Sequence, residues 1–166
     1  MTSLKKSQQS IGIEHIAAAM TPAASRAGGR RYVLDANALL GFFEARHGAA
    51  QKIRKLFDEA RRLDRPLFMS AVTWGEIFYI EWRRHGETGA QQAENVLQEL
   101  PIVVIAVDRE RASRVGALKQ KHSLGYADAF AAELAIERRA WLVTADPEFS
   151  RVGQLLSIYS LPRHEK

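Results

Sequence analysis

The chain has 166 residues, 46% of them hydrophobic, which is enough for one domain with a buried core. It holds no cysteine, so disulfides, thiolate zinc sites and cysteine nucleophiles are excluded, and its five histidines show no spacing typical of paired zinc ligands. A net charge of +5 suits a polyanionic partner, and from charge alone a plain solvated basic surface explains it equally well. No apolar run reaches the roughly 20 residues of a membrane span.

The first 29 residues differ in composition from the rest of the chain. They contain a Ser- and Gln-rich stretch and a weak apolar piece, residues 11–20, which Glu14 interrupts, so that it makes a poor signal-peptide core. We therefore predict that residues 1–29 are a flexible N-terminal extension, or an artefact of cloning or of start-site assignment. Residues 30–166 are predicted to form the folded domain.

From residue 30 onward, short apolar runs alternate with segments of helical periodicity. The pattern predicts strands at 31–34, 67–70, 102–107, 140–143 and 157–161, the last at a sheet edge. Between them it predicts helices at 36–46 and 49–63, from after residue 70 to about 84, over 86–100, from after residue 108 to about 122, and over 126–138. Thr73 and Asp108 are predicted to cap two of the helices. Strands separated by helices imply a parallel sheet covered on both faces. The predicted fold class is α/β, a three-layer α/β/α sandwich with a mostly parallel central sheet.

Four carboxylates, each beside an apolar segment, are the most informative feature of the sequence: Asp35, Glu76, Asp128 and Asp146. No basic residue lies within two positions of any of them. Carboxylates gathered without cations repel one another, and a site that keeps them ionised usually holds a divalent metal. Two of the acids follow predicted strands, and two lie in the first turns of helices that follow strands. All four can therefore meet at the sheet edge where open parallel sheets bind ligands.

The chemistry of hard cations explains the choice of residue. Mg²⁺ and Mn²⁺ prefer oxygen ligands and keep several waters, so a few carboxylates can hold the ion beside a phosphate and an attacking water. The four acids are thus predicted to be both metal ligands and catalytic residues of phosphodiester hydrolysis. Asn37 and Thr144 are weaker candidates that could orient a carboxylate or a water, and Glu148 could add a fifth carboxylate.

Each acid also has a purely structural explanation. Asp146 precedes a proline and suits a helix cap, and Asp128 suits the first turn of its helix. Asp35 can simply end a strand. Glu76, three residues after Thr73, can close a capping box with that residue, which competes with a metal role. The coincidence of all four at one edge of the sheet favours a shared site.

The acid-bearing segments, in this order, resemble the PIN-domain ribonucleases, and most closely the VapC toxins of bacterial toxin–antitoxin pairs. The similarity runs from about Arg31 to Leu161. The matching segments are Tyr-Val-Leu-Asp-Ala-Asn-Ala-Leu-Leu, Thr-Trp-Gly-Glu-Ile-Phe-Tyr-Ile, Leu-Gly-Tyr-Ala-Asp-Ala-Phe-Ala-Ala and Leu-Val-Thr-Ala-Asp-Pro-Glu-Phe. Many relatives have Ser or Thr where this chain has Asn37, so a role for Asn37 stays open. The resemblance makes these residues the Mg²⁺-binding catalytic acids, with Mn²⁺ as a substitute: Asp35, Glu76, Asp128 and Asp146.

The resemblance also implies partners. It implies endonucleolytic cleavage of RNA, an antitoxin protein whose tail covers the active site, and a homodimer, and the absence of cysteine fits a reducing cytoplasm. One helix is apolar on more than one face, which indicates deep burial or an interface: Trp74, Phe78, Tyr79, Ile80 and Trp82. A basic helix face could follow RNA phosphates or be plain solvated surface: Arg109, Arg111, Arg114, Lys119 and Lys121.

A second hypothesis is a non-catalytic PIN-like module that binds RNA or a protein but cuts nothing. Such a module would neither cleave RNA nor bind metal tightly through these carboxylates. Metal titration therefore separates the two hypotheses.

Overall fold

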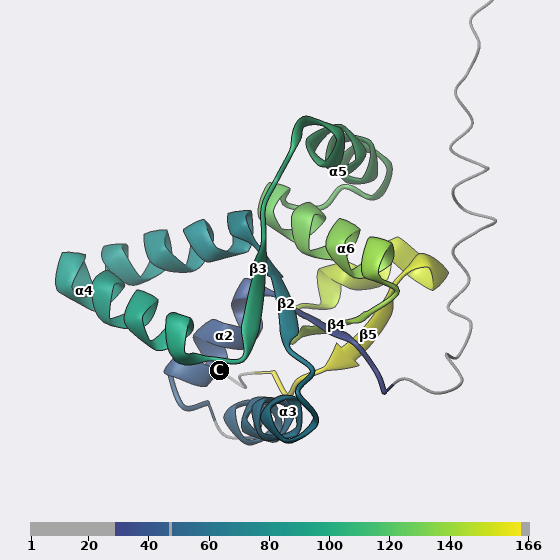
Figure 1. Cartoon of the computed structure of the whole chain (residues 1–166). Coiled ribbons are helices and arrows are strands. Elements are labelled where there is room, and N and C mark those ends of the chain that lie inside the picture. The colour runs from purple at the N-terminus through teal and green to yellow at the C-terminus, as the bar shows by residue number, and fades with distance from the viewer. Residues whose placement is uncertain (1–28, 47, 164–166) are drawn as a thin grey trace, which may run out of the picture.

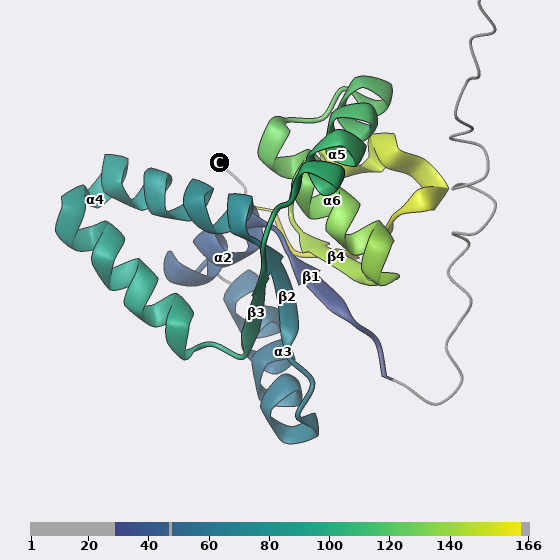
Figure 2. The same cartoon turned by 45° about the horizontal axis from the view of Figure 1, so that its top comes forward.

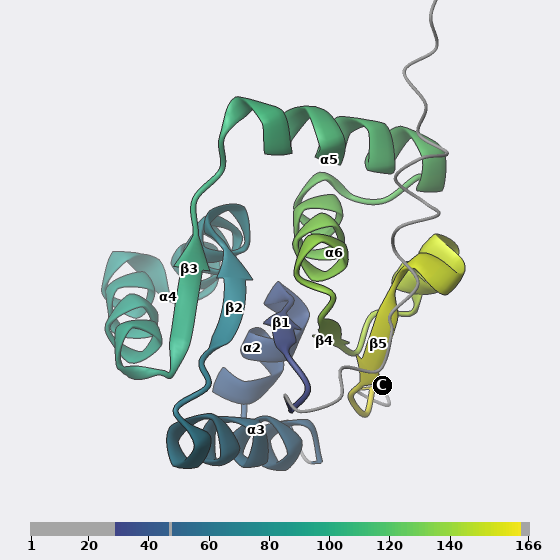
Figure 3. The same cartoon turned by 45° about the vertical axis from the view of Figure 1, so that its right-hand side comes forward.

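Five short strands form one parallel sheet in the computed structural model, which describes residues 29–46 and 48–163. The strands are β1 (Tyr32–Leu34), β2 (Leu67–Ser70), β3 (Ile102–Ile105), β4 (Trp141–Thr144) and β5 (Ser157–Ser160). Their order is β3-β2-β1-β4-β5, so β3 and β5 lie at opposite edges (Figure 3). The predicted parallel sheet is confirmed. Residues 1–28 of the predicted extension lie outside the described residues.

Helices cover both faces of the sheet (Figure 1). They are α2 (Ala36–Phe43), α3 (Ala49–Leu63), α4 (Ala71–Glu99), α5 (Arg109–His122), α6 (Tyr126–Arg138) and the 3₁₀ helix η1 (Pro147–Leu155). Helices α2, α3 and α4 pack on one face, and α5, α6 and η1 pack on the other. The predicted three-layer α/β/α sandwich is therefore confirmed.

The side-chain alternation of the strands separates two cores. Leu34 of β1 and Val143 of β4 belong to the core under α2, α3 and α4. Their neighbours Val33 and Leu142 belong to the core under α5, α6 and η1. All four are fully buried, as expected for a parallel sheet with both faces covered.

Helix α4 bends sharply at Gly86, which has φ 72° and ψ −175°. Only glycine adopts this conformation readily, because a Cβ atom would clash with the backbone. The bend divides α4 into two arms that project from the sheet (Figure 2). The two separate helices predicted around this glycine are these arms, and the first arm carries Glu76.

The capping prediction for the same helix is wrong. The Ser70 hydroxyl caps α4 and accepts a hydrogen bond from the Val72 backbone N–H at 3.2 Å. Because the helix begins directly after β2, Thr73 already lies in its first turn and is buried. The proposed capping box with Glu76 is therefore absent. The Asp108 cap is confirmed by a 2.7 Å hydrogen bond from the Arg111 backbone N–H.

The predicted basic face on α5 is in large part a structural contact with α6. Arg111 is buried and lies 3.2 Å from Glu133 and 2.8 Å from Glu137. Arg114 also pairs with Glu133, at 2.7 Å. The Lys119 ammonium donates to the Leu124 carbonyl. The guanidinium groups of Arg111 and Arg114 are therefore engaged by acids of α6, and Arg111 is too deeply buried to follow RNA phosphates. None of the described helices combines the length and the apolar composition of a membrane-spanning segment.

Candidate active site

The strand order reverses between β1 and β4, which lie side by side at the centre of the sheet. Open parallel sheets bind ligands in the crevice beyond the carboxyl ends of such strands. Asp35 directly follows β1, and Asp146 lies two residues beyond β4. The last residue of β1, Leu34, is paired with Val143, so the two acids leave the sheet at the same place.

Thr144 connects these two acids. Its hydroxyl donates a 2.8 Å hydrogen bond to Oδ2 of Asp35 and accepts a 2.9 Å hydrogen bond from the Asp146 backbone N–H. Both Thr144 and Asp35 are buried, with 1% and 2% of their surface exposed. A short chain of hydrogen bonds therefore fixes the Asp35 carboxylate relative to the turn that carries Asp146.

Burial and neighbouring charge make Asp35 a weaker acid than an ordinary aspartate. Loss of hydration, together with the charges of Asp128 and Glu76, raises the pKa of Asp35 from 3.8 to about 7. The hydrogen bonds from Thr144 and from the Ala36 backbone act in the opposite direction. A carboxyl group with such a pKa is poised to ionise when a cation approaches.

Asp128 interacts electrostatically with each of the other three acids. Burial raises the pKa of Glu76, and the charge of Asp128 raises it further. Burial likewise raises the pKa of Asp128, with added repulsion from Asp146 and Glu148. Since Asp128 also raises the pKa of Asp35, Asp128 lies within electrostatic reach of each of the other three predicted acids.

The donor set of this edge suits a hard divalent cation. No described Lys, Arg or His side chain forms an ion pair with any of the four acids. Two buried oxygens nearby in sequence, Asn37 Oδ1 and Thr73 Oγ1, have no hydrogen-bond partner among the described residues. An all-oxygen set without a balancing cation fits Mg²⁺ or Mn²⁺.

The carboxylates do not form a closed cage. Within residues 29–46 and 48–163, no three Asp, Glu or His side chains are close enough around one point to enclose a metal ion as they stand. Mutual repulsion among ionised carboxylates disfavours closer approach, and a cation between them would reverse that balance. The residues therefore fit the ion by chemistry and location, and its binding requires them to draw together.

Asp146, Glu148 and Asn37 lie at the beginnings of the helices that follow β4 and β1. Asp146 caps η1, because its Oδ1 accepts a 2.7 Å hydrogen bond from the Glu148 backbone N–H. Glu148 itself is exposed and lies 3.4 Å from Arg151, so it contributes charge from outside. Asn37 lies half-buried in the first turn of α2. The structural cap and a site role are thus compatible for Asp146.

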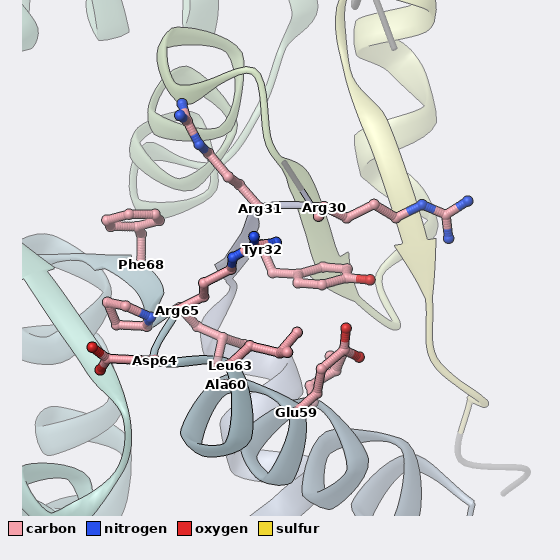
Figure 4. Close-up of a pocket in the computed structure, with 13 residues that line it drawn as sticks. Arg30, Arg31, Tyr32, Glu59, Ala60, Leu63, Asp64, Arg65 and Phe68 are labelled. Carbon is pink, nitrogen blue, oxygen red and sulfur yellow. The ribbon is translucent and has the colours of Figure 1, made fainter. Parts of the chain in front are cut away.

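Two pockets open at opposite ends of the strands. The larger, of about 310 Å³, lies at the amino ends of β1 and β2, where Tyr32, Arg65 and Phe68 line it (Figure 4). It contains none of the four acids. The smaller, of about 250 Å³, lies beside Asp146 and is lined also by Ser160 and Arg163. Sequence analysis missed these last two residues, because they lie outside the acid-bearing segments.

Replacing Thr144 with valine should weaken divalent metal binding about 10- to 100-fold, as is typical for partners that orient metal ligands. The change keeps the side-chain shape but removes the hydrogen bond to Asp35 and leaves the Asp146 N–H unpaired. Isothermal titration with Mn²⁺ measures the effect, and Thr144→Ser, which keeps the hydroxyl, is the control. Equal affinities for the valine and serine variants would contradict this role.

Comparisons with solved structures find the same fold. VapBC2 from Rickettsia felis, bound to a promoter DNA fragment, matches with a TM-score of 0.62 and 17% identity, over 79% of this chain and 98% of that one. A toxin–antitoxin complex from Klebsiella pneumoniae matches at 0.58 and 23%, over 78% and 96%. VapC20 from Mycobacterium tuberculosis, a sarcin–ricin loop cleaving toxin, matches at 0.61 and 15%, over 74% and 95%.

Sequence comparison places the chain in a family. No curated protein matches the chain in sequence. The family model for the PIN domain, however, matches residues 32–155, a span that begins at β1 and ends with η1 and holds all four acids. The chain therefore belongs to the PIN-domain family.

Proposed function

We propose that this chain is a divalent-metal-dependent endoribonuclease and acts as the toxin of a toxin–antitoxin pair. The observation that carries the proposal is the gathering of Asp35, Glu76, Asp128 and Asp146 at one sheet edge without a cationic partner among the described residues. Membership of the PIN family and the fold shared with a toxin that cleaves the sarcin–ricin loop support it.

Each acid has a defined place in the proposed site. A bound Mg²⁺, or Mn²⁺ in its place, would stabilise charge on the phosphate and acidify a water. Asp35, oriented by Thr144, and Asp146 would hold it from the ends of β1 and β4. Glu76 and Asp128 would hold it from α4 and α6. In the proposed reaction, a water oxygen would bond to phosphorus and release a proton. The bond from phosphorus to the sugar oxygen would break, and that oxygen would take up a proton.

An antitoxin is the proposed protein partner. Solved structures with this fold include VapBC and toxin–antitoxin complexes. On α4 of this chain, Tyr79 and Trp82 are 59% and 46% exposed, and they follow Glu76 by three and six residues. An antitoxin tail crossing this apolar surface would reach the acids. We also propose a homodimer and a cytoplasmic location, where RNA substrates are found.

A non-catalytic binding module is the alternative, and the lack of a closed carboxylate cage in the described residues favours it. The two proposals differ in their response to metal. The nuclease should cut labelled RNA in Mg²⁺ or Mn²⁺, lose cleavage in EDTA, and regain it when excess Mg²⁺ is added back. Undiminished cleavage in EDTA would contradict metal dependence, and absence of both cleavage and carboxylate-dependent metal binding would favour the module.

A further inference from the structure

The pocket of about 250 Å³ beside Asp146 combines an acid of the candidate site with a cation. Thr144, Ser150, Ser160 and Arg163 contribute its polar lining. The pocket lies beyond the carboxyl ends of β4 and β5, and therefore on the same sheet edge as the four acids. A ligand group seated there would adjoin the reacting centre without occupying it.

Strand pairing brings Arg163 to this place. Thr144 and Ser160 are partners in the β4–β5 register, and the Leu161 backbone N–H donates to the Thr144 carbonyl at 2.9 Å. The chain after β5 therefore runs along the end of β4, and Arg163 follows two residues later. Lys52 adds a second positive charge near this end of β5, since its ammonium donates to the Ser160 carbonyl at 3.2 Å.

The hydroxyl groups of the pocket are not equivalent. The Thr144 hydroxyl already donates to Asp35, and the Ser150 hydroxyl donates to the Pro147 carbonyl at 2.7 Å. Arg163 and the Ser160 hydroxyl are therefore the side-chain donors available to a ligand in the pocket. Arg163 forms no ion pair with any described acid. A guanidinium fork beside a hydroxyl matches the oxygens of a phosphate group.

We propose that this pocket binds the backbone phosphate next to the scissile phosphate of a single-stranded RNA, with Arg163 as its main ligand. A free anion so close to Asp146 would be repelled, whereas a phosphate tethered to the reacting nucleotide is held there by the rest of the strand. Single-stranded RNA fits because its backbone can turn into a pocket of this kind. The inference rests on the proposed function for its substrate class, and Arg163 binds substrate without touching the reacting atoms.

The experiment asks whether Arg163 contacts one particular phosphate of the RNA. The full-length protein and its Arg163→Ala and Arg163→Lys variants are titrated with fluorescent oligoribonucleotides in EDTA, and binding is followed by anisotropy. Each oligonucleotide carries a single neutral methylphosphonate at a different position. The control is Arg62→Ala, which removes an exposed arginine in the last turn of α3. This turn leads into the amino end of β2, whereas the pocket lies beyond the carboxyl ends of β4 and β5.

We expect Arg163→Ala to weaken binding about tenfold, as for loss of a charge-assisted hydrogen bond. The slope of log K against log salt is negative, and it should become shallower by about 0.7, as expected for the loss of one phosphate contact in a single strand. Arg163→Lys should recover part of the affinity, and Arg62→Ala should bind like wild type. A methylphosphonate at one particular position should weaken RNA binding by wild type but not by Arg163→Ala. With Mg²⁺, Arg163→Ala should raise KM more than it lowers kcat.

Two results would overturn the inference: equal binding by wild type and Arg163→Ala, or methylphosphonate penalties that are the same in both proteins at every position. Its failure is distinguishable from failure of the proposed function. Normal cleavage and normal RNA binding by Arg163→Ala would contradict the role of the pocket but not the proposed nuclease activity. RNA binding that depends on Arg163, without any cleavage by wild type, would contradict the nuclease activity but not the role of the pocket.

Discussion

Asp35→Asn should reduce RNA cleavage on the order of 10³-fold or more while leaving the chain folded. The side chain keeps its size, but the anionic oxygen that would hold the metal at the end of β1 is lost. Asn can still accept the hydrogen bond that the Thr144 hydroxyl donates at 2.8 Å, so local packing is preserved. The initial rate of cleavage in Mg²⁺ measures the effect, and circular dichroism with thermal unfolding checks the fold.

A matched control removes a carboxylate elsewhere on the molecule. Asp64 is an exposed residue that ends α3 in the left-handed conformation, with φ 50° and ψ 47°. Asn tolerates that conformation well, so Asp64→Asn should cleave RNA at the wild-type rate. Cleavage by Asp35→Asn at a tenth of the wild-type rate or more would remove the proposed role of Asp35 as a metal ligand.

Ionisation of Asp35 should lower the free energy of unfolding of the metal-free protein as pH rises from about 4 to about 7. The pKa of Asp35 is about 7 when folded, against an ordinary value of 3.8. Between these values the folded state keeps a proton that the unfolded state has lost, so ionisation opposes folding as pH rises. The raised pKa values of Glu76 and Asp128 act in the same direction.

Comparison with Asp35→Asn isolates the contribution of one carboxyl group. The variant cannot ionise, so in EDTA it should match wild type near pH 4 and exceed it in stability at pH 8, by a few kcal/mol. Urea denaturation at a series of pH values measures the difference. Mg²⁺ should stabilise wild type most at pH 8, because the ion binds the ionised carboxylates. A wild-type stability that rises in parallel with the variant from pH 4 to 8 would contradict this account.

Local patterns in the sequence were sufficient for the framework of the fold. The strands predicted to end at Leu34 and Ser70 end at those residues in β1 and β2, and the strand predicted to end at Val143 ends one residue later in β4. Helical periodicity and Gly86 predicted the two arms of α4. These features depend on residues near in sequence, since the burial of a strand or the bend at a glycine is decided within a few positions.

Choices between equivalent local options were not predictable in the same way. Ser70 and Thr73 are both good helix caps, and only the end of β2 decides that Ser70 fills the position. The arginines of α5 read as a free basic face, although Glu133 and Glu137 on α6 offered a signal. Their spacing of four residues places both on one side of that helix, facing α5.

Residue types and local patterns are enough to identify the available chemistry: four carboxylates without neighbouring cations, placed after strands or early in helices, in an order typical of PIN domains. The three-dimensional fold was needed to place Asp128 within electrostatic reach of the other three acids, to join Asp35 to the Asp146 turn through Thr144, and to bring Arg163 into the pocket beside Asp146. The reason is physical. The type of a side chain is a local property, whereas the distance between two side chains depends on the strand order and register of the whole sheet.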